Sequence, residues 1–214
     1  MDKIEIIGAI IGIIYLILEY KANSWLWLFG VLMPLFYIYL FFHNTLYANA
    51  VINIYYVGAS IYGFWNWKKM KDGKIKEERA TDGEASVISS MPKRAWWPII
   101  GLLALCTAAI AWVLHLLGES EMAVLDGFTA ALNVVGMYML AKGWYQQWLC
   151  WIFVEPIMVI LSLMTGMYPT AVMYLVYCVI AVLGYRRWRK EYERGKEERI
   201  EGGKDGKNEG WKEI

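Results

Sequence analysis

The sequence predicts an all-α polytopic membrane protein in which seven transmembrane helices follow a 3+1+3 order. Three observations lead to this prediction. The chain of 214 residues is 58% hydrophobic, and its charged residues, 19% of the total, gather in two blocks. Seven apolar segments are long enough, or nearly so, to cross a bilayer, and the first three match the last three at a constant offset. This composition excludes an ordinary soluble domain.

The seven expected spans approach the roughly 20 helical residues that about 30 Å of hydrocarbon requires. They lie at 4–19, 25–42, 46–67, 96–117, 122–141, 146–165 and 168–188. Several connections are too short for anything but antiparallel neighbours. The chain therefore divides into a first three-helix repeat (1–67), a loop (68–95), a linker helix (96–121), a second three-helix repeat (122–189) and a charged tail (190–214).

Charge predicts the orientation of these spans. Basic residues crowd the 68–94 stretch and the segment 186–190, whereas the connection 118–121 is acidic. Because short cytoplasmic segments carry the excess of Lys and Arg, we expect the loop and the C-terminus in the cytoplasm. Seven spans then put the N-terminus outside. We expect the tail to continue the last span as a short helix and then to be disordered.

The internal repeat appears when the chain is shifted by 121 residues, which superimposes the two triplets without a gap. Trp27 falls on Trp148, Gly63 on Gly184 and Trp67 on Trp188. An odd linker leaves the two triplets parallel, a known transporter plan that places the substrate between the halves.

Two prolines add to the repeat, because Pro34 and Pro156 lie one residue from the same offset. Each removes a backbone donor, so we expect both helices to be interrupted near mid-span and to serve gating. The alternative is that these prolines only kink their helices.

A lone carboxylate marks the candidate substrate site. Glu155 lies inside an apolar segment, and Trp148, Trp151 and Glu155 follow i, i+3, i+7, so they share one helical stripe. A charge at membrane depth is costly unless it has a partner, and such residues usually serve function. Two indoles and a carboxylate could hold a flat cationic ring. The alternative is a carboxylate at an aqueous rim, or one that only supports packing.

Other polar and aromatic side chains of the predicted spans complete this site. Asn53, Tyr56 and Ser60 share one stripe of the third span with Asn49, and because two amides are costly in lipid, this stripe should face protein or a water-filled path. The remaining candidates are Tyr37, Asn133, Tyr174 and Tyr177.

Several classes of function have no support in the sequence. His43 and His115 are isolated, which argues against a metal site. The cysteines, Cys106, Cys150 and Cys178, lie in apolar runs and are expected to be buried thiols. No nucleophile–base pair, phosphate loop or nucleic-acid signature is recognisable, so we expect neither an enzyme nor a resident cofactor.

Two motifs carry a resemblance to a known family. The run IYGFWNW at 61–67 and the run WLCWIFVE at 148–155 resemble the Pnu family of bacterial vitamin transporters, over about residues 4–190. The family's branches include nicotinamide riboside (PnuC) and thiamine (PnuT) transporters, and its 3+1+3 plan is similar to a full-length SWEET transporter. The resemblance implies a homotrimer in the bacterial inner membrane, facilitated diffusion, and trapping of the vitamin by a cytosolic kinase.

The substrate is the point at which the chain departs from that pattern. The nicotinamide riboside branch typically has Trp-x-x-x-Asn where this chain has Trp151-x-x-x-Glu155, and Gln and Asn in span three where it has Asn53 and Ser60. The resemblance therefore implies uptake of a cationic B vitamin, nicotinamide riboside first and thiamine as the alternative. Two further hypotheses are a symporter with Glu155 as the proton carrier and a receptor or scaffold that does not transport.

Overall fold

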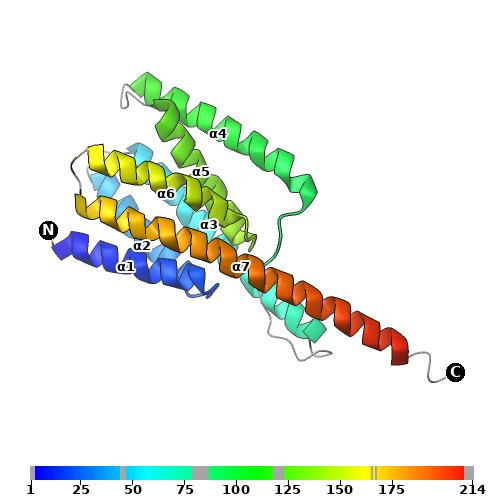
Figure 1. Cartoon of the computed structure of the whole chain (residues 1–214). Coiled ribbons are helices and arrows are strands. Elements are labelled where there is room, and N and C mark those ends of the chain that lie inside the picture. Colours follow the sequence, from blue (N-terminus) through cyan, green and yellow to red (C-terminus); the bar gives the residue numbers. More distant parts are fainter. Residues whose placement is uncertain are drawn as a thin grey trace.

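The computed structural model describes residues 3–43, 47–78, 87–117, 123–164, 166 and 168–209, and this part of the chain is almost entirely helical (Figure 1). A short parallel bridge joins Ser89 to Trp144. The helices are α1 (Lys3–Tyr20), α2 (Leu26–His43), α3 (Tyr47–Glu78), the 3-10 turn η1 (Lys93–Ala95), α4 (Trp96–Leu117), α5 (Ala123–Ala141), α6 (Gln147–Met164) and α7 (Tyr168–Glu209).

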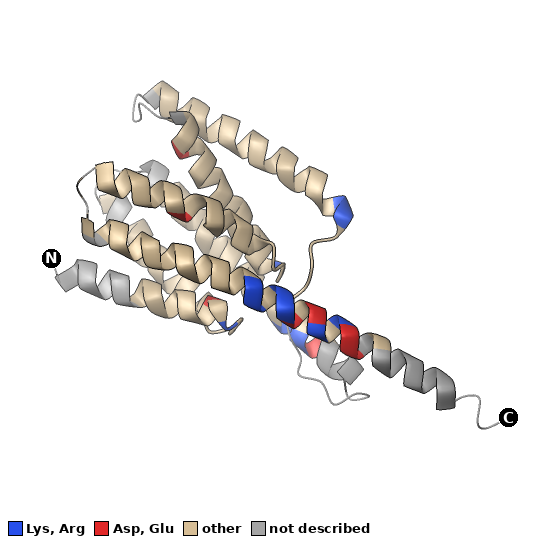
Figure 2. Cartoon of the chain, viewed as in Figure 1, with Lys and Arg blue, Asp and Glu red and all other residues tan. Residues whose placement is uncertain are grey.

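Helix length and composition agree with the predicted helical membrane protein. Within the described residues, four helical segments are long and apolar enough to cross a membrane, namely Lys93–Leu116, Val124–Ala141, Gln147–Met164 and Thr170–Glu198. Two shorter apolar segments, Ile11–Tyr20 and Leu26–Tyr39, belong to α1 and α2. Figure 2 shows that the coloured charges lie mainly on the part of α7 that leaves the bundle, while the bundle itself is nearly free of them.

Two helices are longer than the sequence predicted. The third span was expected to end at residue 67, yet α3 continues to Glu78 into the expected loop. The tail was expected to become disordered, yet α7 continues to Glu209. Extending a helix that packing already holds requires no new nucleation, and Lys, Glu and Arg favour helix. Ion pairs from Arg189 to Glu193 (2.8 Å) and from Arg194 to Glu198 (3.7 Å) follow the i, i+4 spacing that supports such an extension.

The helices pack in two groups. In one, α2 lies along α3, and in the other, α6 lies along α7. Helix α1 joins the first group through α2 and also contacts α7 of the second group. Helix α5 joins the second group through α6 and also contacts α3 of the first group. Helix α4 packs on α5, and none of its apolar window is buried, so it stands at the edge of the bundle in Figure 1.

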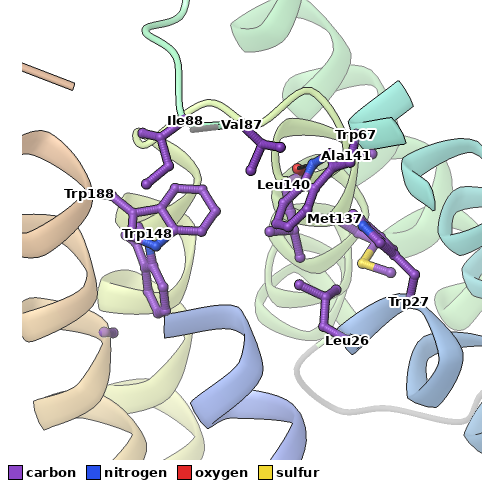
Figure 3. Packing of buried hydrophobic residues seen from close by; sticks show 11 residues of the cluster. Leu26, Trp27, Trp67, Val87, Ile88, Met137, Leu140, Ala141, Trp148 and Trp188 are labelled. Carbon is purple, nitrogen blue, oxygen red and sulfur yellow. Dashed lines mark hydrogen bonds between the residues drawn. The ribbon is translucent and has the colours of Figure 1, made fainter. Parts of the chain in front are cut away.

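A cluster of four buried tryptophans lies where these groups meet (Figure 3). Trp27 packs edge-on against Trp67 with ring centroids 5.2 Å apart, and Trp148 packs edge-on against Trp188 at 5.8 Å. A glycine makes room for each pair, because a Cβ on Gly184 would lie 2.6 Å from the ring of Trp148, and a Cβ on Gly63 would overlap the ring of Trp27.

Part of the expected loop 68–95 is packed into the core. Val87 and Ile88 are buried members of the cluster, and Figure 3 shows Val87 between the two tryptophan pairs and Ile88 next to the Trp148–Trp188 pair. The Ser89 N–H donates to the carbonyl of Gly143 (2.7 Å), and the Tyr145 N–H donates to the carbonyl of Ser89 (3.0 Å). Residues 87–91 thus form a docked segment on the α5–α6 turn, held by apolar burial and by paired backbone groups.

Candidate functional site

A cavity of about 320 Å³ is lined by residues of α1, α2, α3, α5, α6 and α7, whereas α4 contributes none of the lining residues. This volume is at the lower end of the range for small-molecule sites. Both groups of helices contribute to the wall, so the cavity lies between them. Its lining residues are Ile11, Gly12, Tyr15, Leu16, Glu19, Phe29, Gly30, Met33, Pro34, Tyr56, Asn133, Met137, Trp151, Glu155 and Tyr177.

Glu19, near the end of α1, is a buried polar group of this wall that accepts two hydrogen bonds. It is only 2% exposed. Its Oε1 accepts hydrogen bonds from Trp151 Nε1 at 2.9 Å and from Gln147 Nε2 at 3.0 Å, and both donors belong to α6. Donors of this kind reduce the penalty for burying a carboxylate, although neither of them carries a positive charge.

Glu155 is the second carboxylate of the cavity and lies one turn beyond Trp151 on α6. Its Oε2 is buried and has no hydrogen-bond partner among the described residues. The lining residues include no Lys, Arg or His. A cavity with two carboxylates and no basic side chain in its wall is electrostatically suited to a cation, which would supply the missing partner.

Aromatic and amide groups complete the wall. The Tyr15 hydroxyl points at Met137 Sδ (3.9 Å), and Asn133 Nδ2 donates to the Thr129 carbonyl (2.8 Å) within α5. One N–H of the Asn133 amide is therefore used within α5. Together with the ring of Trp151, these side chains offer a mainly apolar surface with a few polar groups, which is typical of small-molecule sites.

The structure brings half of the predicted site residues together at this cavity. Those that line it are Tyr56, Asn133, Trp151, Glu155 and Tyr177, together with the predicted gating residue Pro34. The others, Tyr37, Asn53, Ser60, Trp148, Tyr174 and Pro156, do not line it.

Each of the other side chains has a different environment. Trp148 is fully buried in the tryptophan cluster, on the side of α6 that faces α7. Tyr174 is not among the lining residues, and its ring packs edge-on against that of the lining residue Tyr177 with centroids 6.0 Å apart. Tyr37 and Pro156 are exposed, and Asn53 is half-buried on α3. The i, i+3, i+7 stripe of α6 is therefore divided, with Trp148 in the core and Trp151 and Glu155 at the cavity.

The expected helix interruptions at the prolines are absent, because α2 continues through Pro34 and α6 through Pro156. Pro34 has no N–H for the carbonyl of Gly30, four residues earlier. Ser60 on α3 replaces that donor, and its Oγ donates to Gly30 O at 2.8 Å. Side-chain hydroxyls commonly satisfy backbone groups that proline frees in membrane helices. Ser60 thus has a structural partner, and it is not at the cavity.

Sequence reasoning missed Glu19, Tyr15 and Gln147. Glu19 ends the first apolar run and was interpreted as the border of the span. The available signal was its spacing of four residues from Tyr15, which puts both side chains on one face of α1. For metal ions, the described residues contain no group of three or more His, Cys, Asp or Glu side chains that could bind one.

Comparison with known proteins identifies related chains. A family model described as "Nicotinamide mononucleotide transporter" matches residues 2–190. The nicotinamide riboside transporter PnuC of Neisseria mucosa is 26% identical over 196 residues, which cover 88% of this chain and 72% of that protein. PnuC of Escherichia coli is 22% identical, covering 91% of this chain and 89% of that protein. The riboflavin/roseoflavin transporter RibM of Streptomyces davaonensis is 24% identical, covering 92% and 90%.

A solved structure has the same fold. The crystal structure of the vitamin B3 transporter PnuC superimposes with a TM-score of 0.64 at 24% sequence identity. The match covers 87% of this chain and 80% of that one. The helical arrangement in Figure 1 is therefore one that a known membrane transporter adopts.

Proposed function

Because the chain belongs to the nicotinamide mononucleotide transporter family, we propose that it mediates facilitated uptake of a cationic B vitamin across the bacterial inner membrane. Nicotinamide riboside is the first candidate substrate, since relatives over most of the chain carry that name. The substrate occupies the cavity between the two groups of helices, next to Trp151, Glu155 and Glu19.

The observation that carries this proposal is the pair of carboxylates in a cavity wall without basic side chains. Nicotinamide riboside has a permanent positive charge on a flat pyridinium ring. Carboxylates at membrane depth are costly without a partner, and a cation is the partner that offsets this cost. The indole of Trp151, which Glu19 orients through its N–H, offers an aromatic face to such a ring.

Two other vitamins compete for this assignment. Thiamine is also flat and cationic, so the same wall suits it. Riboflavin enters the comparison because RibM is a relative of similar identity. Its ring system is uncharged near neutral pH and leaves both carboxylates without a counter-ion. We therefore place riboflavin behind the two cationic vitamins.

The proposed architecture has seven transmembrane spans in a 3+1+3 plan, with the N-terminus outside and the C-terminus in the cytoplasm. The matching pairs Trp27–Trp67 and Trp148–Trp188 support two equivalent triplets, and the exposed helix α4 suits a linker. The basic segment of α7 supports a cytoplasmic C-terminus. We also propose a homotrimer with one pathway in each subunit.

Transport by this route is downhill. A uniporter only equilibrates its substrate, so we propose that a cytosolic kinase phosphorylates the vitamin and thereby keeps it inside. A proton-coupled symporter with Glu155 as the carrier is the competing mechanism. Dissipating the proton gradient of reconstituted vesicles distinguishes them, because the initial rate of a uniporter stays the same and that of a symporter falls.

Calorimetric titration of the purified chain with nicotinamide riboside, thiamine and riboflavin tests the substrate directly. We expect saturable binding of nicotinamide riboside, weaker binding of thiamine, and the weakest binding of riboflavin. Tightest binding of riboflavin, or no binding of either cationic vitamin, contradicts the proposal. Binding without entry into vesicles that contain the cognate kinase and ATP points instead to a receptor.

A further inference from the structure

A second cavity, of about 420 Å³, lies where the end of α1 meets the part of α7 that leaves the bundle. Its lining residues are Lys21, Arg187, Lys190, Glu191 and Arg194. None of them lines the cavity proposed for the vitamin. This second cavity, the basic pocket, therefore needs its own explanation.

The spacing of the α7 residues explains why these side chains converge. Arg187, Lys190 and Arg194 follow i, i+3, i+7 and so share one face of the helix. Two contacts to Tyr20 hold the end of α1 opposite this face. The indole N–H of Trp188 donates to the Tyr20 carbonyl (3.1 Å), and the Arg187 guanidinium lies over the Tyr20 ring, 4.6 Å from its centroid. Lys21, the next residue, is thereby positioned at the basic pocket.

Charge in the basic pocket is strongly one-sided, because four cationic side chains and one carboxylate line it. Arg194 also approaches Glu198, but at 3.7 Å and with both side chains well exposed, so this pair offsets little of the positive charge. The vitamin cavity has the opposite character, with two carboxylates and no basic lining residue. The two cavities therefore suit ligands of opposite charge.

We propose that the basic pocket binds a phosphate group. Guanidinium groups offer paired donors that match phosphate oxygens, and ammonium groups add point charges from other directions. Two arginines and two lysines around one hollow provide both kinds of contact. The phosphate belongs either to a soluble phosphorylated molecule or to the head group of an anionic lipid at the same membrane surface.

Binding there has a structural consequence, since the ligand contacts Lys21, the residue that follows α1, and the three cations of α7. It therefore ties the end of α1 to α7, two residues from Glu19 of the vitamin cavity. A ligand that binds only the folded protein raises its unfolding temperature. This inference goes beyond vitamin uptake and does not depend on which vitamin the main cavity accepts.

The test uses the full chain in nanodiscs, with inorganic phosphate as the soluble probe and phosphatidylglycerol as the lipid probe. In discs of phosphatidylcholine alone, the unfolding temperature is followed during a phosphate titration, with chloride at equal ionic strength as the reference. In a second series without phosphate, phosphatidylglycerol replaces part of the phosphatidylcholine. The double variant Arg187→Gln/Lys190→Gln removes two cations from the basic pocket. Its matched control, Arg189→Gln/Lys196→Gln, removes two exposed cations of α7 that do not line it.

A soluble ligand is indicated when phosphate raises the unfolding temperature and the double variant weakens the apparent affinity by at least about tenfold, the scale for losing hydrogen bonds to a charged group. A lipid ligand is indicated when only phosphatidylglycerol stabilises the protein and the double variant abolishes that effect. In both cases the control double variant behaves as the wild type. The proposal is overturned if neither probe stabilises the wild type, or if the two double variants respond alike.

Discussion

Trp67 and Trp188 pack against each other in the buried tryptophan cluster, with ring centroids 6.2 Å apart and ring planes inclined by 54°. The two residues are 121 positions apart, which is the offset of the sequence repeat. Each donates its indole N–H to the other group, Trp67 to the carbonyl of Leu140 at the end of α5 (3.0 Å) and Trp188 to that of Tyr20 at the end of α1 (3.1 Å). The two groups are therefore joined reciprocally at this tryptophan cluster.

The first prediction concerns the glycines beneath this cluster. We expect Gly63→Ala and Gly184→Ala each to destabilise the protein by about 1–3 kcal/mol, because the new methyl group overlaps a buried indole ring. Thermal unfolding in detergent measures the effect. Gly58→Ala on α3 is the matched control, since nothing lies within 4 Å of a Cβ there. Equal unfolding temperatures for Gly58→Ala and Gly63→Ala would contradict the packing described for Trp27.

The second prediction separates charge from geometry at Glu19 and Glu155. Both hydrogen bonds to Glu19 end on Oε1, so the amide oxygen of Glu19→Gln can accept them while the negative charge is lost. We expect Glu19→Gln and Glu155→Gln each to weaken vitamin binding by about 1–3 kcal/mol in calorimetric titrations.

The control for this pair is Glu193→Gln, which removes an exposed carboxylate of α7 outside the cavity. Its affinity should equal that of the wild type. Unchanged affinity in Glu155→Gln and Glu19→Gln would remove both carboxylates from the substrate site, while an effect of Glu193→Gln of equal size would indicate a general influence of net charge.

The third prediction is that Ser60 matters because of Pro34. Ser60→Ala leaves the Gly30 carbonyl without the Oγ donor, and we expect a loss of about 1–3 kcal/mol of stability. In a Pro34→Ala background the N–H of residue 34 can reach that carbonyl, so the same Ser60→Ala change should have a much smaller effect. A double-mutant cycle on unfolding free energies measures this coupling. Additive effects would show that Ser60 does not replace the donor that proline lacks.

The fourth prediction tests the docked segment 87–91. Gly143 has φ +70°, and a Cβ there would also collide with the Val87 carbonyl. Gly166 has φ +74° with nothing within 4 Å of a Cβ. Left-handed backbone costs a residue with a Cβ roughly 1–2 kcal/mol, so Gly166→Ala should lose about that much.

We expect Gly143→Ala to lose clearly more stability than Gly166→Ala, because it also displaces the segment. Limited proteolysis should then cut the chain near Val87 faster in Gly143→Ala than in the wild type. Similar losses in the two variants, with unchanged proteolysis, would mean that the segment does not depend on close contact with the α5–α6 turn.

Much of the helical fold could be predicted because the relevant signals are local. The length of an apolar run depends only on neighbouring residues, and the constant spacing of Trp27, Gly63 and Trp67 from their counterparts is visible without any structure. The same holds for Glu155, whose charge is conspicuous in its apolar surroundings. The predicted ends of α3 and α7 were wrong. Once packing has nucleated a helix, polar residues that follow can continue the helix as readily as they can form a loop.

The residues that line the cavity could not be predicted in the same way. Whether Trp148 or Trp151 faces the cavity depends on how α6 is rotated against its neighbours, and close packing on Gly184 and Trp188 sets that rotation. Glu19 meets Trp151 across 132 residues of chain, a contact that no periodicity reveals. Composition and spacing therefore sufficed to predict a helical membrane protein and to single out Glu155 as a candidate site residue. Only the tertiary structure decided that Glu19 lies at the cavity and accepts hydrogen bonds from Gln147 and Trp151, because side chains on different helices meet only when the helices are assembled.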